Sequence, residues 1–177
     1  MTRRPDTVFL DRDGTINVKA PEGSYVLRPE DMRLLPGAGA AVRRLNAAGV
    51  LVIVVTNQRA VALGLIDEAG LARVNRQLED LLAAQGAHLD GVYVCPHDNG
   101  SCTCRKPAGG LLLQARADFP GIDFARSVLI GDSESDVQAA LACGVEAIRL
   151  APAETRSRAG ALRDDLASAV EQLLTPG

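Results

Sequence analysis

Short apolar runs alternate with segments of helical pattern along this chain, and few folds accommodate that order. Five runs rich in β-branched and aliphatic residues are predicted strands: Thr7–Leu10, Val50–Val55, Val92–Val94, Ser127–Ile130 and Ala147–Leu150. Continuous apolar runs of this kind are typical of parallel strands that are covered on both faces. The alternation therefore predicts an α/β fold: a Rossmann-like, doubly wound parallel sheet with right-handed crossovers.

Helices are predicted between these strands from the spacing of their apolar residues. Four of them span Ala38–Ala48, Glu68–Ala84, Gly110–Ala117 and Ser135–Ala142, and a glycine, the common stop signal, follows three of them. A final helix is expected over Thr155–Leu173. The 177 residues, 47% of them apolar, fit a single domain over residues 1–177 with a sizeable core.

Composition argues against several kinds of partner. The net charge of -3 and the aromatic content of 3%, with no Trp, do not suit a nucleic-acid surface. The longest apolar run, Val50–Val55, is too short to span a bilayer, and the residues before Thr7 contain no signal-peptide core. We therefore expect a cytoplasmic monomer that acts on a small molecule and binds neither nucleic acid nor a membrane.

Acidic residues follow two of the predicted strands. Asp11 and Asp13 project to the same side of an extended segment, and a divalent cation relieves the repulsion between converging carboxylates. Asp132 and Asp136 follow another strand and could add a third ligand and a supporting group. Taken alone, Asp-x-Asp-Gly more often forms a turn or a helix cap. The acids at the matching edge of the sheet favour a metal site, and oxygen ligands favour Mg²⁺ over Zn²⁺.

Two further polar positions suit a phosphate group. The hydroxyl of Thr56 and the backbone N–H groups around Asn57 could hold phosphoryl oxygens, although a local turn explains this tripeptide equally well. Lys106 and Lys19 are the two lysines of a chain that otherwise uses arginine. A lysine in the segment Cys-Arg-Lys-Pro indicates a compact point charge, with a solvated surface lysine as the alternative.

Three cysteines and a histidine fall within ten residues of one another: Cys95, His97, Cys102 and Cys104. Three thiolates and one imidazole complete a tetrahedral zinc set with no open position, so we expect a structural Zn²⁺. In a reducing compartment such a cluster is more typical of a metal site than of disulfides, and unpaired buried cysteines are the alternative. Cys143 stands apart and is predicted to be a small core residue.

Four segments resemble, in order, the motifs of haloacid dehalogenase-type phosphatases: Asp11–Thr15, Val55–Asn57, Lys106–Pro107 and Gly131–Asp136. The resemblance covers about residues 8 to 145. It implies that Asp11 attacks phosphorus to form an aspartyl-phosphate. It also implies that Asp13 protonates the leaving alcohol and later activates water.

The same resemblance implies the binding groups. Thr56, Asn57 and Lys106 would hold the phosphoryl group. Mg²⁺ would be bound by Asp11, by the backbone carbonyl of Asp13 and by Asp132, with Asp136 as a second ligand or a supporting group.

No segment is long enough for an inserted lid, so no cap domain is expected. The lidless subgroup with a zinc loop includes heptose-1,7-bisphosphate 7-phosphatases and histidinol-phosphate phosphatases. Phe9–Asn17, Ser24–Val26 and Asp90–His97 look most like the heptose enzymes. The resemblance then implies that Arg105 recognises the distal end of the sugar, for which a bidentate guanidinium is suited.

The expected reaction is removal of the 7-phosphate from D-glycero-D-manno-heptose 1,7-bisphosphate, a step toward nucleotide-activated heptose. Histidinol-phosphate phosphatase is the first alternative, because the zinc loop is short. The absence of an obvious aromatic residue that could stack on an imidazole argues weakly against it. Ser133 and Arg59 also differ from the pattern of the heptose enzymes. The second alternative is a phospho-ligand sensor without activity, which would not need both Asp11 and Asp13.

Overall fold

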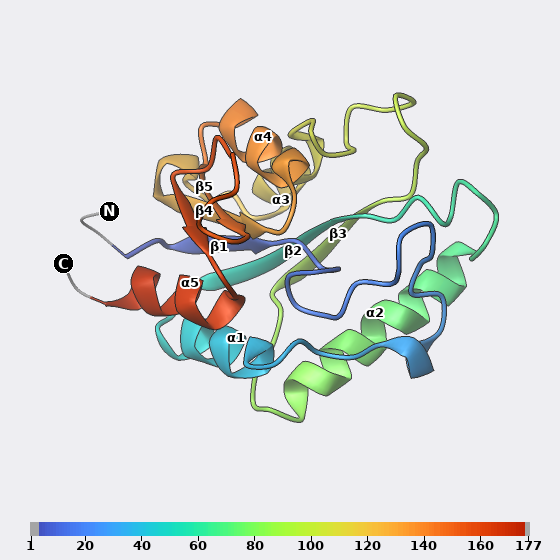
Figure 1. Ribbon diagram of the computed structural model, residues 1–177, viewed down its shortest axis with the longest axis horizontal. Coiled ribbons are helices and arrows are strands. Elements are labelled where there is room, and N and C mark those ends of the chain that lie inside the picture. Colours follow the sequence, from blue (N-terminus) through green and yellow to red (C-terminus); the bar gives the residue numbers. More distant parts are fainter. Residues whose placement is uncertain (1–3, 176–177) are drawn as a thin grey trace.

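The computed structural model describes residues 4–175, and its central feature is a six-stranded sheet in which all neighbouring strands are parallel (Figure 1). The strands are β1 (Thr7–Leu10), β2 (Leu51–Asn57), β3 (Gly91–Cys95), β4 (Ser127–Gly131), β5 (Glu146–Leu150) and β6 (Ala161–Arg163). Their order is β3-β2-β1-β4-β5-β6, so the direction of winding reverses at β1. Open α/β sheets bind ligands at such a reversal, beyond the carboxyl ends of the strands.

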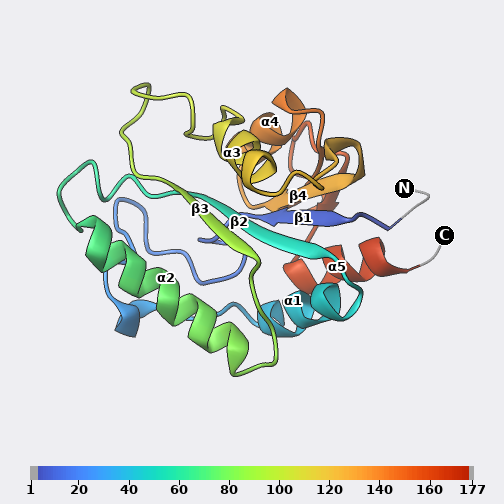
Figure 2. The ribbon, with the colours of Figure 1, turned by 180° about the vertical axis from the view of Figure 1, so that it is seen from behind.

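Helices cover both faces of the sheet (Figures 1 and 2). The helices are α1 (Ala38–Ala47), α2 (Glu68–Ala83), α3 (Gly110–Asp118), α4 (Glu134–Ala142) and α5 (Leu166–Leu174), with short 3₁₀ helices at Pro29–Asp31 and Phe124–Arg126. The core on one face packs against α1, α2 and α5, and that on the other against α3 and α4. Successive residues of β1 alternate between the two cores: Val8 and Leu10 belong to the first and Phe9 to the second.

The predicted fold class and the five predicted strands are confirmed, but the expected helix over Thr155–Leu173 is wrong. Its first half is irregular and then forms β6, which pairs with β5 through Leu162 and Arg149. Two groups in this segment, the hydroxyl of Ser157 and the backbone N–H of Arg158, bind the carboxylate of Glu134 instead of forming a helical turn. The helix begins only after Asp165, whose side chain accepts a hydrogen bond from the backbone N–H of Ser168 at 2.7 Å.

The connection from β1 to α1 crosses the carboxyl edge of the sheet without forming a domain of its own. It contains only one short 3₁₀ helix, Pro29–Asp31, and no cap covers this edge in the part of the chain that the structure describes. Within residues 4–175, no helix combines the length and the apolar character that crossing a membrane requires.

Candidate active site

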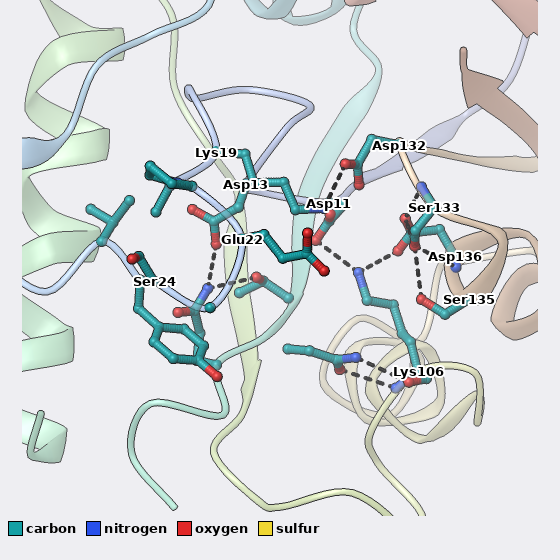
Figure 3. Close-up of a pocket in the computed structure, with 18 of the residues that line it drawn as sticks. Asp11, Asp13, Lys19, Glu22, Ser24, Lys106, Asp132, Ser133, Ser135 and Asp136 are labelled. Atoms are coloured by element: carbon teal, nitrogen blue, oxygen red, sulfur yellow. Dashed lines mark hydrogen bonds and ion pairs between the residues drawn. The ribbon is translucent and has the colours of Figure 1, made fainter. Parts of the chain in front are cut away.

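A cavity of about 360 Å³ lies at the carboxyl ends of β1, β2 and β4, where the winding reverses (Figure 3). The register pairs Leu10 of β1 with Val54 of β2 and with Ile130 of β4, so the residues that follow these three positions converge. Asp11, Asp13, Thr56, Asn57, Arg105, Lys106, Asp132 and Asp136 all line the cavity. The structure therefore brings together every residue that was predicted to bind phosphate or Mg²⁺ or to act in catalysis.

Lys106 lies between two carboxylates at the floor of the cavity. Its Nζ is 2.8 Å from Oδ1 of Asp11 and 2.6 Å from Oδ1 of Asp136, and it donates to the carbonyl oxygen of Val55 at 2.7 Å. Burial lowers the pKa of Lys106, but the two carboxylates outweigh that effect and raise it above 10.5. Burial raises the pKa of Asp11 to about 7, with Lys106 opposing the shift. A bound divalent cation would favour the ionised form of Asp11, which is the nucleophilic form.

Asp13 is fixed by three donors. Its carboxylate accepts from Nδ2 of Asn17 at 2.9 Å, from Nε2 of Gln58 at 2.8 Å and from Nη2 of Arg12 at 3.1 Å. Arg12 is completely buried and also donates to Oδ1 of Asn75 on α2 at 2.8 Å. Burial would raise the pKa of Asp13, but Arg12 and the hydrogen bonds outweigh it and hold the pKa below 3.8. Asp13 is therefore ionised in the free protein, as a general base must be.

Thr56 and Asn57 have different surroundings at the end of β2. The hydroxyl oxygen of Thr56 accepts from Nε2 of Gln58 at 2.9 Å. The Asn57 side chain binds the backbone of Lys106 at both ends: its Nδ2 donates to the Lys106 carbonyl, and its Oδ1 accepts from the Lys106 N–H, each at 3.0 Å. Asn57 lines the cavity, but its amide is engaged in holding Lys106 in place.

Three carboxylates approach closely enough to share a cation. Asp11, Asp132 and Asp136 each offer an oxygen, and these oxygens lie within 4.8 Å of one another. Asp136 already has partners on both oxygens, since Oδ2 accepts from the hydroxyl of Ser133 at 2.7 Å and Oδ1 meets Lys106. Asp11 and Asp132 are therefore the carboxylates best placed to ligate a metal. Carboxylate oxygens suit Mg²⁺.

The position of Asp132 depends on a glycine in the loop after β1. Gly14 has φ +85°, which L-residues rarely adopt, and a Cβ there would lie 2.5 Å from Oδ2 of Asp132. Any side chain at this position would displace the carboxylate. The glycine therefore allows the β1 loop and the β4 loop to approach closely enough for Asp11 and Asp132 to share one ion.

The predicted zinc ligands form a compact cluster in the loop after β3. The distances among the sulfurs of Cys95, Cys102 and Cys104 are 3.3 to 3.6 Å, and Nδ1 of His97 is 3.2 Å from the Cys104 sulfur. Sulfur ligands about 2.3 Å from a tetrahedral centre are roughly 3.8 Å apart, so this set fits Zn²⁺ with little adjustment. All three cysteines are free, as is Cys143, whose sulfur packs near the carbonyl of Gly109.

The site also depends on residues that the sequence patterns did not indicate. Arg12, Asn17 and Gln58 hold Asp13, and Asn75 in turn holds Arg12. One signal for Arg12 was available, namely a charged residue between two acids directly after a buried strand. Residues 19 to 26 form one wall of the cavity. This wall includes Tyr25, an aromatic residue beside the site, which weakens the argument against histidinol phosphate as the substrate.

Comparison with known proteins gives matches over most of the chain. A family model described as HAD-hydrolase-like matches residues 103–171. The chain is 43% identical over 155 residues to the D-glycero-beta-D-manno-heptose-1,7-bisphosphate 7-phosphatase of Rhodopseudomonas palustris, which covers 83% of each protein. It is 40% identical to the protein of the same name from Escherichia coli K12, over 82% of this chain and 78% of that protein.

A solved structure shares the fold over nearly the whole chain. The crystal structure of D,D-heptose 1,7-bisphosphate phosphatase from B. bronchiseptica, complexed with magnesium and phosphate, superimposes with a TM-score of 0.86. The two chains are 32% identical, and the match covers 96% of this chain and 98% of that one. At this level of identity the two proteins share a family as well as a fold.

Proposed function

The chain belongs to the haloacid dehalogenase-like phosphatases, and we propose that it removes the 7-phosphate of D-glycero-β-D-manno-heptose 1,7-bisphosphate by way of an aspartyl-phosphate. The observation that carries this proposal is the placement of Asp11, with Lys106 at 2.8 Å and a second acid, Asp13, in the same cavity. The heptose substrate and the β anomer are supported by the names of the relatives that are about 40% identical. Retention of both Asp11 and Asp13 supports an enzyme over a phospho-ligand sensor.

The chemistry proceeds in two displacements. The Asp11 carboxylate attacks the phosphorus, and the bond from phosphorus to the sugar oxygen breaks as Asp13 gives that oxygen a proton. Water then attacks the same phosphorus, gives its proton to Asp13, and displaces the Asp11 carboxylate to release inorganic phosphate. Asp13 is ionised in the free protein, so it must take up a proton before the first step; an approaching phosphate dianion raises its pKa and favours this.

The charge that develops on the phosphoryl group is met by fixed groups. The ammonium of Lys106 and the hydroxyl of Thr56 would hold its oxygens. Asp11, Asp132 and the Asp13 carbonyl would bind Mg²⁺, which supplies Lewis-acid stabilisation of that charge. We infer that Asp136 keeps Lys106 charged and in place and that Asn57 fixes the Lys106 backbone.

We propose that the four residues of the cysteine cluster bind a structural Zn²⁺. The loop that they close contains no hydrophobic core of its own, and it leads directly into Arg105 and Lys106. Because Lys106 must reach Asp11 from this loop, fixing the loop fixes the phosphate site. Arg105 lies at the rim, where its Nη1 is 3.4 Å from the His97 carbonyl, and it is available to the distal end of the sugar.

The remaining proposals concern the setting of the enzyme. We propose that the protein is a cytoplasmic monomer formed by a single domain, which the length of 177 residues supports. A cluster of three thiolates is also best preserved in a reducing compartment.

Phosphate release in the presence of Mg²⁺ tests the assignment. The substrates are the α and β anomers of the heptose bisphosphate and histidinol phosphate, at equal concentrations. We expect a preference for the β anomer. Preference for histidinol phosphate, for which Tyr25 in the cavity wall provides an aromatic surface, would overturn the substrate and leave the mechanism in place. Asp13→Asn should abolish turnover, and an unchanged cellular function in that variant would instead favour the sensor.

A further inference from the structure

The cavity contains a cation, Lys19, that the proposed chemistry does not use. Of the residues that the structure describes, five with a carboxylate and three with a cationic side chain line the cavity. Lys106 is 3% exposed and is paired with both Asp11 and Asp136, so it serves the phosphoryl group that is transferred. Lys19 and Arg105 are the cations that remain for any further anionic group of the substrate.

The Lys19 side chain lines the cavity and points toward Asp132 (Figure 3). It comes from the connection between β1 and α1, its side chain is 60% exposed, and its Nζ lies 2.9 Å from Oδ2 of Asp132. An ion pair this exposed contributes little to stability, so the ammonium can leave Asp132 for another anion at little cost. Asp132 is also a proposed Mg²⁺ ligand, and a divalent cation would displace a single ammonium from it.

The substrate proposed above brings a second phosphate into a cavity with an excess of carboxylates. Glu22, on the same wall as Lys19, would repel that phosphate, as would Asp132 if it were not neutralised. A long, flexible, exposed lysine offers three donors and can follow an anion whose position differs from that of the scissile group.

We propose that Lys19 binds the phosphate that is not removed from the substrate, and that it acts in this with Arg105. This inference rests on the proposed function, because it requires a substrate with two phosphates. It assigns to Lys19 the discrimination between a bisphosphate and a monophosphate.

Kinetics on two substrates test this role. In Lys19→Met, which retains an apolar stem and loses the charge, kcat/KM for the heptose bisphosphate should fall roughly 10- to 100-fold, mainly through KM, since a hydrogen bond to a charged group is lost. Hydrolysis of p-nitrophenyl phosphate, at saturating Mg²⁺, should change less than about twofold. Lys19→Arg should recover most of the loss. Arg28→Met is the matched control: Arg28 is an exposed cation of the same connection, paired with Asp31 and outside the cavity lining.

Binding provides a readout that does not depend on turnover. In the Asp11→Asn background, calorimetry should give a dissociation constant for the heptose bisphosphate that is roughly 10- to 100-fold weaker when Lys19→Met is added. Inorganic phosphate should bind equally to both proteins.

Four results would contradict the inference. Equal losses on the two substrates would place Lys19 at the transferred phosphoryl group. A lower half-saturating Mg²⁺ concentration as the only change would make Lys19 a mere competitor of the metal at Asp132. If the wild type prefers the bisphosphate and Lys19→Met leaves kcat/KM for it unchanged, the role of Lys19 is overturned but the proposed function is not. Preference of the wild type for histidinol phosphate would overturn the proposed substrate and this inference together, since that substrate has no second phosphate.

Discussion

The charge state of each ionisable residue in this site is set by the groups that contact it. Lys106 is held charged by two carboxylates, whereas Asp13 is held ionised by a buried guanidinium and two amides. Removal of a charged partner of Lys106 or of Asp13 would leave a buried charge uncompensated, which costs several kcal/mol of folding free energy. Lys19, by contrast, has one exposed partner and is free to respond to a ligand. The fixed charges suit the bond-breaking steps, and the movable charge suits recognition.

The absence of a side chain at Gly14 leaves space for the Asp132 carboxylate, and filling that space should weaken Mg²⁺ binding. Gly14→Ala should raise the Mg²⁺ concentration for half-maximal activity roughly 10- to 100-fold, the effect usual when the support of a metal ligand is disturbed. The reason is that the new Cβ would lie 2.5 Å from the Asp132 carboxylate. The measurement is phosphate release as a function of Mg²⁺ concentration.

Gly49→Ala is the matched control for that variant. Gly49 also has positive φ, +71°, but a Cβ there meets nothing within 4 Å. Both variants should therefore lose about 1 kcal/mol of unfolding free energy from backbone strain. Only Gly14→Ala should change the Mg²⁺ dependence, and an equal change in both would show that the clash with Asp132 is unimportant.

At the scale of elements, the site depends on loops that are tied down by different means. The β1 loop closes on Asp13 through Asn17, and the β4 loop is fixed by the capping box between Ser133 and Asp136 at the start of α4. The loop after β3 has neither arrangement: besides the cysteine and histidine cluster, it is tied by Arg59 to Asp98 at 2.6 Å and by the Asn57 side chain to the Lys106 backbone. It also passes so close to α3 that a Cβ on Gly110 would lie 2.4 Å from the carbonyl oxygen of Thr103.

Removal of zinc should therefore affect activity through this loop. We expect one zinc per chain by elemental analysis of the purified protein. A strong chelator, with Mg²⁺ then restored in excess, should lower both the melting temperature and phosphate release, because the loop that leads into Lys106 loses the support of the cluster.

Substitution of the cysteines separates this effect from general damage. Cys102→Ser should lose the zinc and most of the activity, whereas Cys143→Ser should retain one zinc per chain, since Cys143 lies outside the cluster. Full activity in zinc-free protein would show that the loop is positioned by the chain alone.

At the scale of the whole molecule, one sheet joins all of these loops. Helices α1, α2 and α5 cover one face, and α3 and α4 cover the other, so the residues of the site lie on strands that share both cores. Neither core can be lost without exposing the sheet. We therefore predict a single cooperative transition in urea, with coincident curves from far-UV circular dichroism and from the loss of activity. Loss of activity well before the change in circular dichroism would show that the site opens independently of the sheet.

The sequence by itself determined the doubly wound sheet and the convergence of Asp11, Asp13, Thr56 and Asp132 at one edge. Both follow from local patterns, namely apolar runs of strand length and polar residues directly after them, whereas Lys106 was assigned to the site by its resemblance to a family motif. The same reasoning failed for residues 155–173, where contacts of Ser157 and Arg158 with Glu134 and the pairing of β6 with β5 override helical propensity.

Only the tertiary structure decided what surrounds each functional group. Neither the hydrogen bond that Arg12 donates to Asn75 of α2 nor the approach of Lys19 to Asp132 follows from any spacing along the chain, because their sequence separations are 63 and 113 residues. Such contacts depend on how loops from separate strands pack at the sheet edge. Local pattern places a residue at that edge, whereas packing sets its partners and hence its charge.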